Sequence, residues 1–173
     1  MHRKNISPSI ILTLIILLTT TITSVNAQEQ NSQKKMWAKS FMGKEAPAIE
    51  VEGWINKPVD IKGKYVLVDI WATWCGPCRK VIPEMNEWQA KFNDKLVIIG
   101  ISNETKEKVE SYAKENIKYA NGFDTKSRVK SALQVTGIPH VILINPEGIV
   151  IWEGFPKLPD YELTTEVLQE LMK

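Results

Sequence analysis

One stretch of the sequence constrains the fold of this chain more than any other. Residues 65–71 read Tyr-Val-Leu-Val-Asp-Ile-Trp, and a second apolar run occupies residues 96–101. Continuous β-rich runs of this length are typical of strands that are covered on both faces. Between the two runs, Val81, Met85 and Trp88 recur at helical spacing. The sequence therefore predicts a β-α-β unit, in which the two strands are parallel and the crossover is right-handed.

The remaining hydrophobic pattern predicts further helices and strands around this unit. Helices are expected at about residues 105–115 and 126–133, and a last helix is expected to open at Pro159-Asp160. The apolar runs at residues 140–144 and 149–152 are joined by Asn-Pro-Glu-Gly, which is typical of a type I turn, so these two strands should pair antiparallel. The predicted fold class is α/β, with a mixed central β-sheet flanked by helices on both faces.

The first 27 residues have the layout of a secretory signal peptide. Arg3 and Lys4 precede an almost wholly apolar run at residues 10–18. Val25 and Ala27 then supply small residues at the two positions that a signal peptidase reads. We therefore expect an exported protein that is periplasmic, or otherwise outside the cytoplasm, and soluble after cleavage.

Removal of residues 1–27 would leave 146 residues, which is enough for one core. The full chain has 22 Lys and Arg against 20 Asp and Glu, and the signal contains two of the basic residues, so the mature chain would be balanced. This balance gives no support for nucleic-acid binding. An uncleaved membrane anchor is the alternative, because no charged residue follows residue 5 within the signal. Residues 28–43 are polar and aperiodic and predict a flexible lead-in, and residues 44–173 predict one domain.

The spacing of the two cysteines, Cys75 and Cys78, indicates a chemically reactive pair rather than a structural disulfide. A bridge across two intervening residues closes a very short loop and stabilises a fold little. Cys75 stands just before the predicted helix, where unpaired amide groups and the positive helix end favour a thiolate. Pro77 is tolerated there because the amide that it removes has no helical partner. We expect the outer sulfur to attack a disulfide and the inner one to resolve the product.

The residues around this pair resemble a known family. Residues 66–78, which end in Trp-Cys-Gly-Pro-Cys, look like thioredoxin. Gly137-Ile138-Pro139 is similar to the cis-proline loop of that fold, and Pro83 is similar to the proline of its kinked active-site helix. The exported TlpA/ResA-like branch is the closer resemblance. It is carried by residues 46–47, 62–64 and 71–75 and by the signal.

The resemblance covers about residues 44–173 and implies a thioredoxin-like fold and a thiol-disulfide oxidoreductase. It implies that Cys75 is the nucleophile and that Cys78 breaks the mixed disulfide. Pro139, if cis, would stand across from the sulfurs, and the backbone of Ile138 would bind an extended substrate segment. The other residues expected to contact substrate are Trp74, Gly76 and Pro77.

Asp69 is the one charged residue in the first strand, six positions before Cys75. A carboxylate buried there without a cation should have a raised pKa and could take a proton from Cys78. An Asp at the strand edge, hydrogen-bonded to the backbone or solvated, is the other interpretation.

Three positions depart from the family pattern. Thioredoxin pairs its buried Asp with a Lys on the next strand, where this chain has Gly100. ResA-like proteins have a Glu three residues after the second cysteine, where this chain has Val81, and Glu84 falls on a different helical face. His140 follows the proline where thioredoxins usually have Thr, and either packs in the strand or tunes the site.

The resemblance also implies partners. It implies protein substrates with disulfides or thiols, a membrane thiol-electron donor and no cofactor, and we expect a monomer. Gly-Pro between the cysteines resembles the reducing members of the family, so we predict a reductase, with clients such as apocytochrome c or exported proteins that need disulfide repair.

Three alternatives stay open. A peroxiredoxin-like peroxidase needs Thr or Ser three residues before the attacking Cys, where this chain has Ala72. A metal-binding module needs more ligands than Cys75, Cys78 and His140, so no metal is expected. A redox-inert scaffold would not need both cysteines.

Overall fold

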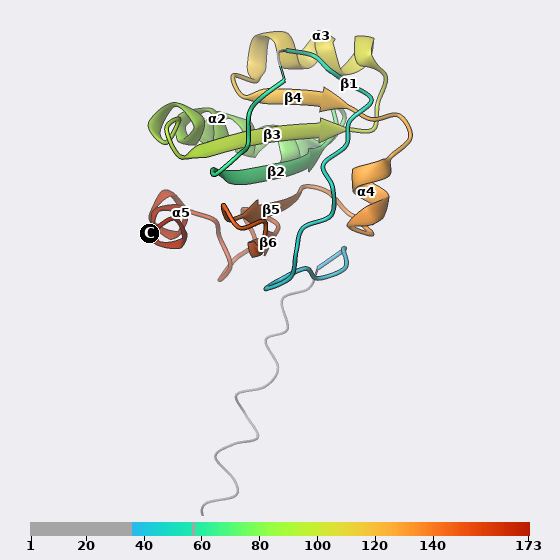
Figure 1. The fold of residues 1–173 in the computed structure, drawn as a ribbon. Helices are drawn as coiled ribbons and strands as arrows, with labels where there is room; N and C mark the ends of the chain where they lie inside the picture. Colours follow the sequence, from blue (N-terminus) through green and yellow to red (C-terminus); the bar gives the residue numbers. More distant parts are fainter. Residues whose placement is uncertain (1–35, 57) are drawn as a thin grey trace, which may run out of the picture. The chain divides into compact units, whose positions relative to one another are not determined.

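The structure, a computed structural model, describes residues 36–56 and 58–173 and places the predicted β-α-β unit at its centre (Figure 1). Strand β2 (Tyr65–Trp71), helix α2 (Gly76–Lys91) and strand β3 (Leu96–Ser102) follow one another directly. The strands β2 and β3 pair in parallel along their whole length, from Tyr65 opposite Leu96 to Trp71 opposite Ser102. This unit and its parallel pairing are therefore confirmed. The predicted signal peptide lies outside the described residues.

The other elements extend the same sheet. They are β1 (Gly53–Trp54), α3 (Lys106–Asn116), β4 (Ala120–Phe123), α4 (Arg128–Ala132), β5 (His140–Ile144), β6 (Val150–Gly154) and α5 (Thr165–Leu171). The described strands form one six-stranded sheet in the order β1-β4-β3-β2-β5-β6. Strand β5 pairs antiparallel with both β2 and β6, so the sheet is mixed, as predicted.

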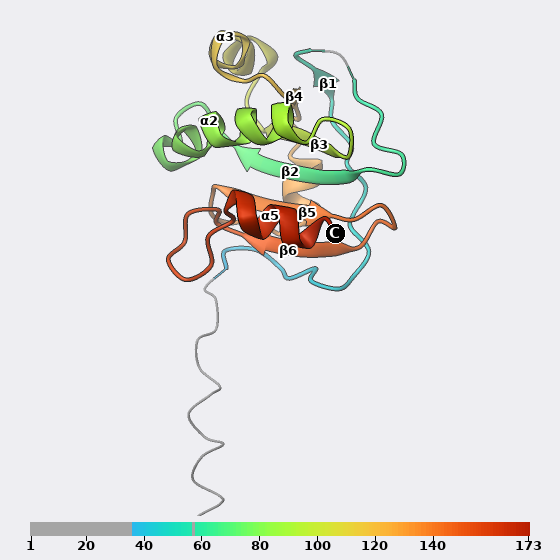
Figure 2. The same cartoon turned by 90° about the vertical axis from the view of Figure 1, so that its left-hand side faces the viewer.

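Alternating side chains of the central strands divide the core into two layers. Leu67 and Trp71 of β2 pack with buried residues of α2, α3 and α5 on one face. Val66 and Val68 point to the other face, where they pack with α4 and with the chain that precedes β1. Figure 2 shows α2 and α5 in front of the sheet. The predicted arrangement of helices on both faces is confirmed.

Two short strands were not predicted. Strand β4 has the sequence Ala-Asn-Gly-Phe, and Asn and Gly are depleted in strands, so its pattern carries little signal. It is held by pairing in parallel with β3 and antiparallel with β1. These strands form one edge of the sheet and bring Tyr119, the residue just before β4, into the core, where it is 2% exposed.

The prediction that the last helix begins at Pro159 is wrong. Asp160 has a φ of +66°, which a right-handed helix does not accommodate. Helix α5 begins at Thr165, six residues after Pro159, because Thr164 caps it: the Thr164 hydroxyl accepts a hydrogen bond from the amide of Val167 at 3.3 Å.

Residues 36–43, the described part of the predicted lead-in, also differ from the flexible segment that the sequence suggested. From Met36 on, this segment belongs to the same compact unit as the rest of the domain. The amide of Lys39 donates to the carbonyl of Leu133 at 3.1 Å, and the amide of Gly43 donates to the carbonyl of Val150 at 2.9 Å. Long-range backbone bonds of this kind hold residues 36–43 against the domain.

Candidate active site

The two cysteines lie at the junction between β2 and α2 and are joined by a disulfide. Cys75 is the N-cap of α2, with an extended backbone conformation. The Cα atoms of Cys75 and Cys78 are 5.3 Å apart, and the amide of Cys78 donates to Sγ of Cys75 at 3.2 Å. The first sulfur therefore sits where the unpaired amides at the start of a 16-residue helix point, as expected from the sequence.

The surface around the disulfide is uneven. Cys75 is only 3% exposed and Cys78 is fully buried, whereas Trp74 is 67% exposed and Pro77 is also exposed. The pair thus lies just below a rim of protruding residues. The contact of Trp74 with substrate stays a prediction.

The proline loop lies at the same end of the sheet. The peptide bond between Ile138 and Pro139 is cis, as the resemblance implied. His140, the first residue of β5, pairs with Ile70, so Pro139 is next to the last residue of β2. Ile138 packs against the core cluster that contains both cysteines. The structure thus brings the proline loop and the cysteine pair to the same end of the sheet.

Asp69 lies in the layer beneath α2, between Leu67 and Trp71 on the same face of β2. It is fully buried, which excludes the solvated strand-edge interpretation. Burial raises the pKa of this carboxyl to about 7, against a smaller lowering effect of a hydrogen bond from Tyr119. The Tyr119 hydroxyl donates to Oδ2 of Asp69 at 3.4 Å.

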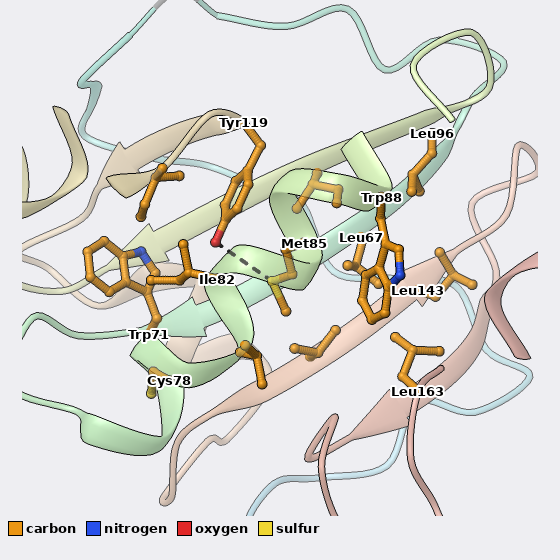
Figure 3. Packing of buried hydrophobic residues seen from close by; sticks show 14 of the residues in the cluster. Leu67, Trp71, Cys78, Ile82, Met85, Trp88, Leu96, Tyr119, Leu143 and Leu163 are labelled. Atoms are coloured by element: carbon orange, nitrogen blue, oxygen red, sulfur yellow. Dashed lines mark hydrogen bonds between the residues drawn. The ribbon is translucent and has the colours of Figure 1, made fainter. Parts of the chain in front are cut away.

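Tyr119 is a residue of this region that sequence reasoning missed. Its ring points into the core toward α2, and its hydroxyl is 3.7 Å from Sδ of Met85 (Figure 3). Burial raises the pKa of this phenol well above its usual range, and the neighbouring Asp69 adds to the effect. The phenol is therefore a hydrogen-bond donor at any ordinary pH. No sequence signal pointed to it, because β4 was not predicted.

Gly100 stands opposite Asp69 in the pairing of β2 with β3, at the place expected from the sequence. A Cβ at Gly100 would lie 2.8 Å from Nδ2 of Asn121 and 3.1 Å from Cε2 of Tyr119. Tyr119 and Asn121 thus fill the space into which a Lys side chain would extend. In place of that Lys, the hydrogen-bond donor to Asp69 is a neutral phenol, that of Tyr119, the residue just before β4.

The other positions that depart from the family pattern are either buried or lie on the surface in an ion pair. Val81 is in the core at 2% exposure, and Glu84 pairs with Lys157 across the surface. His140 is fully buried and shares its sheet face with Ile142, opposite the face of Asp69. It is therefore packed in the strand, on the far side of the sheet from α2.

A second carboxylate, Glu104, holds the loop before Cys75 and was also missed. It accepts hydrogen bonds from the amide of Thr73 at 2.6 Å and from the hydroxyl of Thr73 at 2.7 Å. The Ser102 hydroxyl donates to it at 3.2 Å, and Lys108 pairs with it at 3.4 Å. Burial acts to raise the pKa of Glu104, but these hydrogen bonds outweigh it and lower the pKa.

Two further observations concern only residues 36–56 and 58–173. No group of three or more His, Cys, Asp or Glu side chains is arranged there to hold a metal ion. None of the helices in that part of the chain is both long enough and apolar enough to span a bilayer.

Comparison with known proteins identifies the family. A family model described as thioredoxin-like matches residues 63–150. The chain belongs to the thioredoxin-like family. The thiol-disulfide oxidoreductase ResA of Bacillus thuringiensis subsp. konkukian is 35% identical over 141 residues, which cover 78% of this chain and 79% of ResA. The thioredoxin-like protein YneN of Bacillus subtilis is 25% identical over 147 residues, or 79% of this chain and 84% of YneN.

Solved structures of this family show the same fold. The thioredoxin domain of a thiol-disulfide oxidoreductase from Bacteroides vulgatus superposes with a TM-score of 0.65 at 28% identity, over 77% of this chain and 99% of that domain. A thiol:disulfide interchange protein from Bacteroides sp. gives a TM-score of 0.58 at 32% identity, over 65% of this chain and 80% of that one. This thioredoxin-like chain is an enzyme, a thiol-disulfide oxidoreductase.

Proposed function

We propose that this oxidoreductase is an exported reductase of protein disulfides, in which Cys75 attacks and Cys78 resolves. The observation that carries the proposal is the position of Cys75 at the N-cap of α2, with Cys78 already bonded to it one turn deeper. Amide groups at a helix start stabilise a thiolate, and only the thiolate attacks a disulfide. The secretory layout of residues 1–27 supports the export.

The reaction has two exchange steps. The Cys75 thiolate attacks one sulfur of the substrate disulfide, which forms a mixed disulfide and releases the other substrate sulfur as a thiolate. Cys78 then loses its proton and attacks Sγ of Cys75, which releases the second substrate thiol and leaves the enzyme disulfide. Two electrons pass from the enzyme dithiol to the substrate. A membrane thiol-electron donor outside this chain would return them.

Asp69 is proposed as the base for the second step. It is buried in the layer beneath α2, the helix that carries Cys78, and no cation of residues 36–56 or 58–173 donates a hydrogen bond to it. Because burial raises its pKa to about 7, it can accept a proton near neutral pH and release it again. Tyr119 keeps one of its oxygens oriented by a hydrogen bond.

The substrate segment is proposed to lie between the proline loop and the rim of the cysteine pair. The backbone of Ile138, just before the cis Pro139, would bind an extended segment, and Trp74, Gly76 and Pro77 would contact it from the other side. We propose apocytochrome c, whose oxidised cysteine pair the enzyme would return to thiols, or exported proteins in need of disulfide repair as clients, and a monomeric enzyme. Localisation outside the cytoplasm, with anchoring through an uncleaved signal as the alternative, belongs to the same proposal.

The test is to trap the substrate. The full chain with Cys78→Ser, expressed with its first 27 residues, should accumulate mixed disulfides through Cys75, and Cys75→Ser should accumulate none. A variant that is alkylated at Cys75 but captures no protein would contradict the proposed role. The reduction potential decides the direction: a value near that of thioredoxin, about −270 mV, supports a reductase, and one near about −120 mV indicates an oxidant.

A further inference from the structure

The segment that precedes β1 contacts the proline loop, here defined as residues 136–139. The carbonyl oxygen of Trp37 accepts three hydrogen bonds from this loop. The donors are the amide of Thr136 at 2.7 Å, the hydroxyl of Thr136 at 3.1 Å and the amide of Gly137 at 3.4 Å. One residue from outside the predicted domain thus fixes both residues that lead into Ile138 and Pro139.

The side chain of Trp37 contacts the same loop. A Cβ on Gly137 would lie 2.9 Å from both Cβ and Cγ of Trp37, so only a glycine allows this approach. The Trp37 ring meets Phe155, just after β6, edge-on with the centroids 5.0 Å apart. Trp37 remains 38% exposed, so it is a surface support between the loop and β6 rather than a core residue.

The segment is anchored beyond Trp37 as well. The buried carboxylate of Glu153 in β6 accepts hydrogen bonds from the Ser40 hydroxyl and from the amide of Phe41, the latter at 2.8 Å. The amide of Lys39 bonds to the carbonyl of Leu133, next to α4. The residues that follow Trp37 are thus bonded both to β6 and to the end of α4. These bonds fix the position from which Trp37 supports the loop.

We propose that Trp37 is a positioning residue for the substrate-binding loop of this enzyme. The inference rests on the proposed function, in which the backbone of Ile138 binds the substrate segment. A loop held in its binding shape before substrate arrives loses less conformational freedom on binding. Trp37 therefore acts on the binding of extended protein substrates, and the thiol chemistry at Cys75 does not depend on it.

The experiment uses single-turnover oxidation of the pre-reduced full chain, with thiols counted over time. Insulin serves as the protein disulfide and oxidised glutathione as the small one. Trp37→Ala keeps the carbonyl that bonds to the loop but removes the ring that packs on Gly137 and Phe155. It should raise the half-saturating insulin concentration on the order of tenfold, since binding must then order a loop that has lost this side-chain support. The limiting rate with insulin and the rate with glutathione should stay within about twofold of the unchanged chain.

Three further variants sharpen the result. Trp37→Phe keeps a ring against Gly137 and should recover most of the insulin binding. Gly137→Ala should mimic Trp37→Ala, because its Cβ pushes Trp37 away. Met42→Ala, at a 48% exposed residue of the same segment, is the matched control.

The outcomes separate this inference from the proposed function. Unchanged insulin saturation in Trp37→Ala would overturn the role of Trp37 while leaving the reductase proposal standing. Wild-type chain that reduces neither disulfide, or Cys75→Ser chain that reduces both, would overturn both. Should Trp37→Ala unfold at the assay temperature, Gly137→Ala compared with Met42→Ala decides by the same measurement.

Discussion

The carboxylate of Glu104 clamps Thr73 through two hydrogen bonds, one from the backbone amide at 2.6 Å and one from the hydroxyl at 2.7 Å. Thr73 precedes the exposed Trp74 and lies two residues before Cys75. The loop that presents the candidate nucleophile is thus tied to the start of α3, an element some thirty residues further along the chain.

Removing the charge of Glu104 should loosen this clamp. An amide at this position has one acceptor oxygen instead of two, so Glu104→Gln loses one hydrogen bond and the charge assistance of the other, at a cost of about 1–2 kcal/mol in the free energy of unfolding. Thr73→Val, which keeps the amide but loses the hydroxyl, should cost less. Urea unfolding measures both. Glu87→Gln, at an exposed position inside α2, is the control and should change stability by no more than a few tenths of a kcal/mol; an equal loss there would contradict the clamp.

Replacing Asp69 should slow the resolving step. A positioned base contributes roughly 10²–10⁴-fold to a proton transfer, and Asp69→Asn removes that base with little change in shape. The limiting rate of insulin reduction should fall by about 10²-fold and lose the rise through about pH 7 expected from the pKa of Asp69. Asp94→Asn, at an exposed position, should leave the profile intact. An Asp69→Asn profile that still rises near pH 7 would assign the base elsewhere.

Asp69 should also make the stability of the fold depend on pH. Its pKa is raised from an ordinary 3.8 to about 7 by burial, so the folded chain holds this proton more tightly than the unfolded chain. The stabilisation is complete below about pH 4 and is lost as the pH rises toward 7. The Asp69→Asn variant should therefore gain stability relative to wild type between pH 5 and pH 8, by a few kcal/mol at most. Urea unfolding at these two pH values measures the free energy of unfolding of both chains. A value for Asp69→Asn that falls relative to wild type between pH 5 and pH 8 would contradict the assignment.

The close packing at Gly100 gives a prediction of its own. A Cβ there would lie 2.8 Å from Nδ2 of Asn121 and 3.1 Å from Nε1 of Trp71, so Gly100→Ala should destabilise the fold by about 1–3 kcal/mol. Gly76→Ala meets nothing within 4 Å and should be neutral or slightly stabilising. Thermal unfolding of the two variants measures the contrast. Equal unfolding temperatures would contradict this prediction, because they would mean that Asn121 and its neighbours move aside without a loss of stability.

The sequence predicted the centre of this molecule better than its edges. Strand β2, helix α2 and the positions of both cysteines could be read from hydrophobic periodicity and helix-start chemistry, because those signals are local. The pairing of Asp69 with Gly100 could be anticipated only through the resemblance to thioredoxin. The hydrogen bond from Tyr119, which takes the place of that Lys, could not be anticipated, since Tyr119 reaches Asp69 only through the pairing of β4 with β3.

The contacts that hold the site loops were out of reach for a similar reason. The Glu104–Thr73 bonds join residues 31 positions apart, and the Trp37–Thr136 bond joins residues 99 positions apart. The first joins two common side chains and the second uses a backbone carbonyl, and neither pair has a distinctive spacing in the sequence. The polar composition of residues 28–43 suggested a loose segment, yet residues 36–43 supply backbone groups that pair with the loops they cover.

The hydrogen bond from Tyr119 to Asp69 gives the last prediction. This bond lowers the pKa of Asp69, against the larger raising effect of burial, because the phenol stabilises the charged carboxylate. Tyr119→Phe removes the bond and keeps the ring in the core, so the pKa of Asp69 should rise above about 7. The rise of the insulin-reduction rate with pH should then shift to higher pH, by about half a unit to one unit, which is the equivalent of one modest hydrogen bond.

Tyr112→Phe, which changes a partly exposed tyrosine of α3, is the control and should not move the midpoint. A shift to lower pH in Tyr119→Phe would mean that the phenol stabilises the protonated form of Asp69 instead.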